Sequence, residues 1–286
     1  MPEMPEVQAH AERLTDALAG RELAKFELLN FAALKTFSPA ADAAVGHRLV
    51  EVGRRAKYLL LRWDNGQTHV VHLMQGGRLR PDPKRTRKPK LGLARWVFAE
   101  DEAGGAPEEA WMLTEAGTER KAGVWAVEGD PLTQDPLTGL GPEAEQLTRD
   151  QLAALLAGNS RRLHGMLREQ KTVAGLGRML ANEILYEAGL SPFANAAKLD
   201  DGQIDRLHTA LVEVMQRAID HERTLDDIGK SIDRPSKVHN RSGESCFDCD
   251  DTIRTVEYRK YTVYYCPAAQ TGGKLLADNT TSKFLK

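Results

Sequence analysis

The apolar positions of this 286-residue chain follow a helical period at the start and short strand-like runs afterwards. Apolar side chains at 7, 11, 14 and 18, with glycine at 20, predict an amphipathic helix over Val7–Leu18. The next apolar runs are separated by turn signals such as Asn65-Gly66. They predict strands at Leu49–Val52, Tyr58–Trp63, His69–Leu73, Trp96–Phe98 and Trp111–Leu113. The first part of the chain is therefore predicted to be a β-rich domain with a leading helix.

The pattern becomes helical after a stretch rich in proline and glycine at 130–143, which indicates a linker. Helical periodicity runs from 148 to about 227, with breaks at Gly175, Gly177, Gly189 and Pro192. From Lys237 onward, cysteine and aromatic residues predict a small hairpin module. We place the domain boundaries at 1–133, 134–147 for the linker, 148–236 and 237–286.

Charge and cysteine content narrow the classes of function. The net charge of −2 is unusual for a nucleic-acid-binding protein, but 54–90 carries eleven Lys and Arg against two Asp, a local excess of nine. Such a segment can bind phosphates, although a solvated loop explains the run Lys84–Lys90 equally well. Two of the three cysteines form a Cys-x-x-Cys pair, which favours metal binding over a disulfide framework. Without an apolar run of roughly 18 residues or a signal-peptide core, a cytoplasmic protein with no membrane partner is expected.

The N-terminus carries candidate chemistry at Pro2 and Glu3. If Met1 is removed, the chain begins with the secondary amine of Pro2. An α-amino group has a pKa of about 7.7–8.0, against about 10.4 for lysine, so part of it is unprotonated at neutral pH. An unprotonated amine can condense with a sugar aldehyde to a Schiff base. A retained Met1 would leave no free amine at Pro2.

The order of these modules resembles the formamidopyrimidine-DNA glycosylase/endonuclease VIII family over the whole chain. The opening Pro2–Val7 is similar to the family's N-terminus, and Gly139–Glu143 is similar to its interdomain linker. Val173–Pro192 resembles its helix–two-turns–helix, and Val238–Cys246 resembles the entry to its zinc finger. The resemblance implies an α+β fold: an N-terminal β-sandwich with a leading helix, then a helix–two-turns–helix domain with a C-terminal zinc-finger-like β-hairpin.

The resemblance also implies a mechanism and a partner. Pro2 would attack C1′ of a flipped-out damaged nucleotide, and Glu3 would protonate the sugar and move protons. Lys57 matches the family's lysine near the lesion phosphate. The expected activity is that of a bifunctional DNA glycosylase and abasic-site lyase in base-excision repair. It would act as a nucleoid-associated monomer on double-stranded DNA with oxidised bases or abasic sites.

The family's DNA-contacting positions differ in part here. Gln75 stands where a methionine often fills the emptied stack, and Lys121 and Ala122 replace an arginine and a phenylalanine. Tyr261 replaces a phosphate-binding arginine. The resemblance therefore assigns DNA binding to Gln75, Lys121, Gly175, Gly177, Arg178, Arg259 and Lys260.

The expected zinc finger lacks one ligand. Tetrahedral zinc needs four ligands, and the family supplies two Cys-x-x-Cys pairs. Cys246, Cys249 and Cys266 are present, but Ala269 occupies the fourth position. Either zinc binds through three thiolates and another group, or aromatic packing alone holds the hairpin.

Three functions remain open from the sequence. The first is the glycosylase/lyase, whose preferred base (oxidised purine, oxidised pyrimidine or none, at an abasic site) is not determined by the residues. The second is a non-catalytic binder of abasic or distorted DNA, because several positions for reading the lesion are replaced. The third is an RNA- or ribosome-associated protein, because these modules recur in other contexts.

Overall fold

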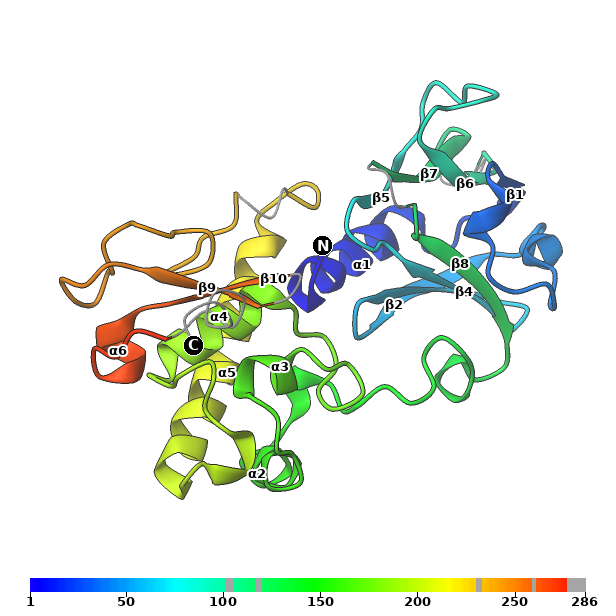
Figure 1. Cartoon of the computed structure of the whole chain (residues 1–286). Helices are drawn as coiled ribbons and strands as arrows, with labels where there is room; N and C mark the ends of the chain where they lie inside the picture. Colours follow the sequence, from blue (N-terminus) through cyan, green and yellow to red (C-terminus); the bar gives the residue numbers. More distant parts are fainter. Residues whose placement is uncertain (101–104, 117–119, 230–232, 259–260, 277–286) are drawn as a thin grey trace. The chain divides into compact units, whose positions relative to one another are not determined.

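The computed structural model describes residues 1–100, 105–116, 120–229, 233–258 and 261–276 (Figure 1). The chain divides into two compact units. Unit 1 comprises Met1–Gly139 and Glu222–Ile228, and unit 2 comprises Leu140–His221 and Gly229–Lys286. No helix among the described residues is long and apolar enough to cross a membrane.

Unit 1 begins with helix α1, Met4–Leu18. Glu3 is the N-cap, and a capping box joins it to Glu6, with the Glu3 N–H donating to Glu6 Oε2 at 3.0 Å. The helix ends before Gly20, whose φ of +82° suits glycine. Thr15 Oγ1 donates to the Val52 carbonyl and accepts its N–H, so α1 is fixed along strand β2, Leu49–Arg55 (Figure 1).

Two four-stranded antiparallel sheets form the rest of unit 1. One has the order β1-β6-β7-β5, and the other has the order β2-β3-β4-β8. The further strands are β1 Leu23–Leu28, β3 Tyr58–Trp63, β4 Gln67–His72, β5 Gly77–Pro81, β6 Gly92–Phe98, β7 Glu109–Glu115 and β8 Gly123–Glu128. Buried side chains of both sheets and of α1 share one core, which includes Leu14, Leu61, Trp63, Trp96 and Leu113. This arrangement is a β-sandwich with a leading helix.

Unit 2 is helical and ends in a hairpin. Its helices are α2 Arg149–Ala157, α3 Leu163–Leu167, α4 Arg178–Glu187, α5 Asp201–Arg223 and α6 Pro267–Thr271, and α5 ends within unit 1. Strands β9, Arg254–Tyr258, and β10, Tyr261–Tyr265, pair antiparallel. Of the short 3₁₀ turns, η4 and η5 lie in unit 2, at Ala144–Gln146 and Ala196–Lys198, and η1–η3 lie in unit 1, at Phe31–Ala33, Ala41–Ala44 and Pro131–Thr133. Tyr186 of α4 joins Val238, Cys246, Ile253 and Cys266 in a second core beneath the hairpin.

The predicted fold class is confirmed, whereas individual elements differ. The first helix begins at Met4 rather than Val7, because the capping box and Pro5 start it one turn earlier. Strands β1, β5 and β8 were not predicted. The predicted boundaries at 133, 147 and 236 divide the chain more finely than the two compact units do, and they remain predictions.

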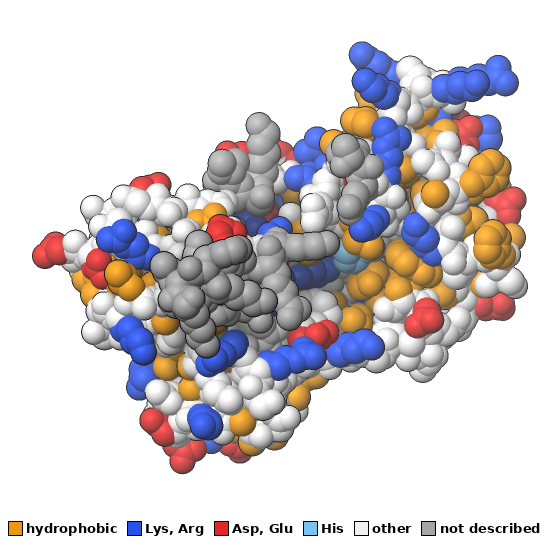
Figure 2. All heavy atoms as spheres, viewed as in Figure 1, with side chains coloured by type: hydrophobic (Ala, Val, Ile, Leu, Met, Phe, Trp, Pro, Cys, Tyr) orange, Lys and Arg blue, Asp and Glu red, His pale blue; other side chains and the backbone are white. Residues whose placement is uncertain are grey.

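The basic run Lys84–Lys90 lies on the loop between β5 and β6. Figure 2 shows Lys and Arg side chains gathered over this loop. Lys84, Arg87, Lys88 and Lys90 are exposed, while Arg85 pairs with Glu108. The loop therefore presents most of its positive charge to solvent.

Candidate functional site

The N-terminal end of α1 places Pro2 and Glu3 in a buried environment. Pro2 is buried and Glu3 is only 4 % exposed, whereas Met1 is 42 % exposed. With Met1 in place, the Pro2 nitrogen is part of a tertiary amide. Removal of Met1 would leave a secondary amine next to the Glu3 carboxylate and the first turn of α1.

Lys57 lies in the two-residue turn that joins β2 to β3. Its neighbour Ala56 has a φ of +51°, in the left-handed region that tight turns require. Arg54 fixes this turn: its Nε donates to Gln8 Oε1 of α1 at 2.8 Å, and its Nη1 donates to the Ala56 carbonyl at 3.0 Å. Lys57 is 6 % exposed, so its side chain is largely withdrawn from solvent.

His72, at the end of β4, lies beside Lys57. Burial, and then the positive charge of Lys57, lower the pKa of His72 from 6.5 to about 4. Its Nδ1 accepts the Met74 N–H at 3.1 Å, and its ring lies 4.5 Å from that of Tyr58, centroid to centroid. At neutral pH His72 is therefore an uncharged neighbour of the Lys57 amine.

Glu6 and Arg78 extend the cluster of charges in unit 1. Glu6 is 3 % exposed and lies one turn into α1. Burial and the nearby Arg80 lower the pKa of Arg78, while Asp227 and Glu6 oppose that shift. Glu6, His72 and Arg78 were not predicted as site residues. Two features of the sequence could have identified two of them. Glu6 lies three residues after the N-cap, which is the spacing of a capping box, and His72 ends an apolar strand.

The two loops of unit 1 that carry Gln75 and Lys121 are arranged differently. Gln75 is exposed in the β4–β5 loop, while Met74, with a φ of +51°, packs against the core. Lys121 is exposed just before β8, but Ala122 is 1 % exposed and donates its N–H to Glu115 Oε2 at 2.7 Å. Lys121 and Gln75 can therefore reach a ligand, and Ala122 belongs to the core.

The glycine turn before α4 lies in unit 2. Gly175 has a φ of +96°, and its N–H donates to Gln170 Oε1 at 3.0 Å. Gly177 is the N-cap of α4, and the exposed Arg178 is its first residue. The turn thus presents Arg178 at a helix N-terminus, where anions are stabilised, and the Gly175 N–H is used within the turn.

The three cysteines of the hairpin module converge. Their Sγ atoms all lie within 4.8 Å of one another, and those of Cys249 and Cys266 are 3.4 Å apart. Zinc holds thiolates at about 2.3 Å in a tetrahedron, so this set fits three of its four positions. Ala269 lies exposed in α6 and offers no ligand atom. His239 is engaged elsewhere, with Nδ1 2.8 Å from Asn182 Nδ2.

Tyr186 supports the cysteine cluster from α4. Its hydroxyl lies 3.0 Å from Cys246 Sγ and donates to Asp248 Oδ2 at 2.8 Å. Burial, together with Cys246 and Asp248, raises the pKa of this phenol well above its usual value. The phenol therefore stays protonated next to the Cys246 sulfur.

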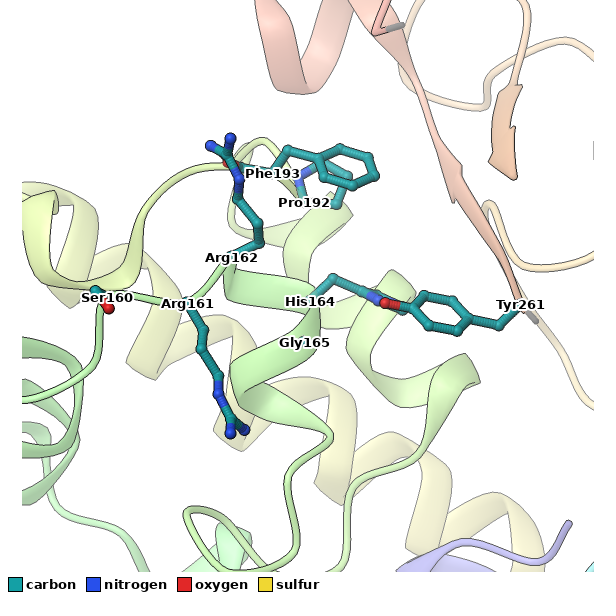
Figure 3. A pocket seen from close by; sticks show the side chains of 8 residues that line it. All are labelled: Ser160, Arg161, Arg162, His164, Gly165, Pro192, Phe193 and Tyr261. Atoms are coloured by element: carbon teal, nitrogen blue, oxygen red, sulfur yellow. The ribbon is translucent and has the colours of Figure 1, made fainter. Parts of the chain in front are cut away.

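The remaining sequence-predicted DNA contacts fall between β9 and β10 in the sequence. Arg259 and Lys260 are outside the described residues. Tyr261, which begins β10, stacks on His164 of α3 with ring centroids 5.7 Å apart (Figure 3). The Arg168 guanidinium lies 4.1 Å from the Tyr261 ring centre. Tyr261 is therefore part of a stack of two rings and one guanidinium.

Fold and site define a protein with an N-terminal β-sandwich, a helical domain with a glycine turn and a hairpin with clustered thiols. Residues 1–106 match the sequence model of the formamidopyrimidine-DNA glycosylase N-terminal domain, and residues 138–228 match that of the formamidopyrimidine-DNA glycosylase H2TH domain. The formamidopyrimidine-DNA glycosylase of Chloroflexus aurantiacus is 32 % identical over 282 residues, which cover 94 % of this chain and 98 % of that protein. The chain therefore belongs to the formamidopyrimidine-DNA glycosylase family.

Other similarities agree with this assignment. An uncharacterized formamidopyrimidine-DNA glycosylase-like protein of Mycobacterium tuberculosis is 41 % identical over 152 residues, covering 51 % of this chain and 94 % of that protein. The crystal structure of the MutM (Fpg) protein from Thermus thermophilus has a TM-score of 0.81 at 26 % identity, covering 96 % of this chain and 100 % of that one. The Lactococcus lactis Fpg bound non-covalently to abasic-site DNA has a TM-score of 0.82 at 22 % identity, covering 94 % and 100 %, a similarity of fold alone.

Proposed function

We propose that this protein is a base-excision DNA glycosylase with abasic-site lyase activity. Membership of the formamidopyrimidine-DNA glycosylase family supports the glycosylase class. The observation that carries the lyase proposal is the buried Pro2–Glu3 pair at the start of α1, in the same unit as the buried Lys57, whose turn Arg54 bonds to α1.

The proposed reaction begins at the Pro2 amine after removal of Met1. Its lone pair forms a bond to C1′ of the flipped-out nucleotide, and the bond from C1′ to the base breaks. The base leaves with the electron pair of that bond and takes up the proton lost from the Pro2 nitrogen. Protonated Glu3 donates its proton to the sugar ring oxygen, the ring opens, and an iminium ion (a Schiff base) forms between Pro2 and C1′. Loss of a C2′ proton then expels the 3′ phosphate, and a second elimination expels the 5′ phosphate. Water finally hydrolyses the imine and restores the amine.

Lys57 is proposed to hold a phosphate next to the lesion. Its amine is buried beside the neutral ring of His72, so its positive charge is not cancelled by that neighbour. A charge-assisted contact in such a site fixes the sugar against Pro2. Gln75 and Lys121 are exposed on two loops of the same unit and are proposed to contact the damaged strand or its partner.

Unit 2 is proposed to bind the DNA backbone. Arg178 is exposed at the start of α4, where its guanidinium and the helix end both attract phosphate. Gly175 and Gly177 hold the turn that presents it. Arg259 and Lys260 keep this assignment from the sequence alone. The proposed partner is double-stranded DNA with an oxidised base or an abasic site, bound by a monomer.

Zn²⁺ is the proposed metal of the hairpin. Cys246, Cys249 and Cys266 would hold it, and it would stabilise the module without entering the reaction. Asp248, already bonded to Tyr186 next to Cys246, would support a solvent ligand in the fourth position.

A panel of damaged duplexes tests the proposed activity. Duplexes with one oxidised purine, one oxidised pyrimidine or one abasic site are incubated with the protein, and strand cleavage is measured. We expect cleavage of the abasic duplex and of at least one oxidised duplex, and loss of both with Pro2→Gly. Absence of cleavage by protein that lacks Met1 would contradict the proposal.

The second candidate is a non-catalytic binder of abasic DNA. The contacts of Tyr261 with His164 and Arg168, at a position where the family resemblance implies an arginine, favour it. This function predicts tight, salt-sensitive binding to abasic duplex without cleavage. The same panel, read by both cleavage and binding, separates the two candidates.

A further inference from the structure

The proposed nucleophile and the proposed phosphate-binding amine lie on different elements of unit 1. Pro2 precedes α1, and Lys57 lies in the turn between β2 and β3. Two such groups act together only if their separation is held, because a misplacement of about 1 Å can lower a rate roughly a hundredfold. Hydrogen bonds between α1 and this turn therefore bear on the reaction.

Arg54 joins α1 to the turn through one guanidinium. Its Nη1 donates to the Ala56 carbonyl at 3.0 Å, and its Nε donates to Gln8 Oε1 at 2.8 Å. The Ala56 carbonyl is part of the planar peptide bond between Ala56 and Lys57. The contact with Arg54 therefore restricts the backbone from which the Lys57 side chain leaves the turn.

Gln8 can serve Arg54 in one orientation of its amide only. Its Nε2 donates to Glu12 Oε1 at 2.9 Å, one turn further along α1. An ionised carboxylate only accepts hydrogen bonds and a guanidinium only donates them. The Gln8 oxygen therefore has to face Arg54 and the Gln8 nitrogen has to face Glu12, because the reversed amide would place donor against donor and acceptor against acceptor.

Arg223 fixes the carboxylate at the other end of this series. Its Nε donates to Glu12 Oε2 at 2.9 Å and its Nη2 donates to Glu12 Oε1 at 2.7 Å. The bonds from Arg223 lower the pKa of Glu12; burial opposes this shift, and the bond from Gln8 adds to it. Glu12 is therefore ionised at neutral pH and remains an acceptor for Gln8. Arg223 belongs to the part of α5 that lies in unit 1, so the whole series lies within that unit.

We propose that Gln8 and Arg54 are positioning residues, which hold the β2–β3 turn against α1 so that the Lys57 amine meets a DNA phosphate at a fixed place relative to Pro2. The inference rests on the proposed function for the contact between Lys57 and phosphate. It adds two residues that act through Lys57 and are assigned no contact with DNA of their own.

Neutral phosphates in the DNA test the proposal without relying on cleavage. Each duplex carries one reduced abasic site, which cannot form an imine, and one methylphosphonate, placed in turn at each position near that site. Affinity is measured by fluorescence anisotropy. A methylphosphonate removes one negative charge, so it should weaken binding of the unchanged protein at the phosphate that Lys57 contacts. Binding of Lys57→Met should be insensitive to the methylphosphonate at that position.

Gln8→Leu should share the position dependence of Lys57→Met. We expect Lys57→Met to lose roughly tenfold in affinity, as for a hydrogen bond between charged groups, and Gln8→Leu to lose about threefold or more. The methylphosphonate that Lys57→Met no longer senses should affect Gln8→Leu less than it affects the unchanged protein, because a displaced amine gains less from that charge. Arg54→Met should behave in the same way, which covers the case that Gln8→Leu fails to fold.

Two matched variants control for the loss of a side chain. Gln216→Leu removes an amide that donates to Asp220 at 2.9 Å, also four residues further along a helix, in α5. Arg62→Met removes an arginine of the same pair of strands, one that bonds to Glu51 instead of the turn. Both variants should bind every duplex as the unchanged protein does. A loss with either control as large as that with Gln8→Leu would overturn the assignment.

The contrary results separate the inference from the proposed function. Unchanged affinity and sensitivity in folded Gln8→Leu and Arg54→Met, with a loss in Lys57→Met, would overturn the inference and leave the proposed function standing. Weakening that is equal at all phosphate positions would also overturn it, because it would show a structural role alone. Lost sensitivity of Arg54→Met at a different phosphate would show that Arg54 binds DNA itself. If Lys57→Met keeps full sensitivity at every position, the phosphate contact of Lys57 is wrong and the inference fails with it, whatever cleavage assays show for Pro2.

Discussion

Glu3 is both the N-cap of α1 and the proposed proton donor, and an isosteric change separates these two roles. Glu3→Gln keeps a side-chain oxygen for the helix end but removes the acidic proton. We expect the single-turnover rate on abasic duplex to fall by about a hundredfold or more, because positioned acid–base groups contribute roughly 10²–10⁴. The free energy of unfolding should change by less than about 1 kcal/mol. A rate within threefold of the unchanged protein would contradict the assigned role.

His69 shows how a single buried ring makes unit 1 sensitive to acid. Its Nδ1 accepts from Trp96 Nε1 at 2.9 Å, and its Nε2 lies 2.9 Å from the Ala41 carbonyl, so the neutral tautomer with hydrogen on Nε2 satisfies both contacts. Burial lowers the pKa of His69 to about 4, and the pKa values of His10 and His72 are also lowered to about 4. A proton on Nδ1 would break the bond to Trp96.

The pH dependence of stability follows from these shifts. The folded pKa values lie below the unfolded value of 6.5, so below pH 6.5 the unfolded chain binds more protons and stability falls as pH falls towards 4. We expect a loss of about 2 kcal/mol for each such histidine at pH 5. Urea unfolding at pH 7.5, 6 and 5 measures the free energy of unfolding. In His69→Gln this free energy should depend less steeply on pH. A flat stability between pH 7.5 and 5 would exclude this account.

At the scale of elements, the β4–β5 loop that carries Gln75 depends on close backbone approach. A Cβ on Gly77, the first residue of β5, would lie 2.1 Å from the Leu73 carbonyl oxygen, which also accepts the Gly77 N–H at 2.8 Å. We expect Gly77→Ala to destabilise unit 1 by about 1–3 kcal/mol. Gly165→Ala, whose Cβ meets nothing within 4 Å, is the control, and urea unfolding compares the two. Equal urea-unfolding midpoints for Gly77→Ala and Gly165→Ala would contradict this prediction, because they would show that the loop accommodates the added Cβ.

The hairpin module predicts a second element-scale result. Ala269→Cys places a thiol where the three present thiolates lack a fourth, on α6 close to Cys266. We expect zinc affinity to rise by roughly tenfold or more. With cobalt in place of zinc, the thiolate charge-transfer band should be stronger in Ala269→Cys than in the unchanged protein. An identical spectrum and affinity would mean that position 269 does not face the metal.

Strand positions explain which elements were predictable from the sequence. The apolar runs that became β3, β4, β6 and β7 lie inside the sheets and are largely buried. The strands that sequence reasoning missed, β1, β5 and β8, are all edge strands, and of β2, the fourth edge strand of the sandwich, only the first part was predicted. An edge strand has one neighbour, so its sequence needs less apolar alternation; β5 reads Gly-Arg-Leu-Arg-Pro and resembles a loop.

At the scale of the whole molecule, the sequence indicates candidate site residues where their chemistry is local in sequence. Pro2 and Glu3 are adjacent, and the cysteines follow a recognisable spacing, so both groups stood out. His72 next to Lys57, and Tyr261 on His164, depend on strand register and on the packing of a hairpin against a helix. No periodicity in the sequence reports such contacts, because they form only when distant segments fold together.

The central claim is that Pro2 is the nucleophile, and borohydride trapping on a duplex with one abasic site tests it most directly. Borohydride reduces an imine to a stable amine, so a covalent protein–DNA adduct forms only if a Schiff base is present. Mass spectrometry of the N-terminus establishes whether Met1 has been removed, and peptide mapping locates the adduct. We predict an adduct at Pro2 in protein that lacks Met1, and none with Pro2→Gly. Absence of any adduct from protein with a free Pro2, or an adduct at a lysine that persists in Pro2→Gly, would contradict the account.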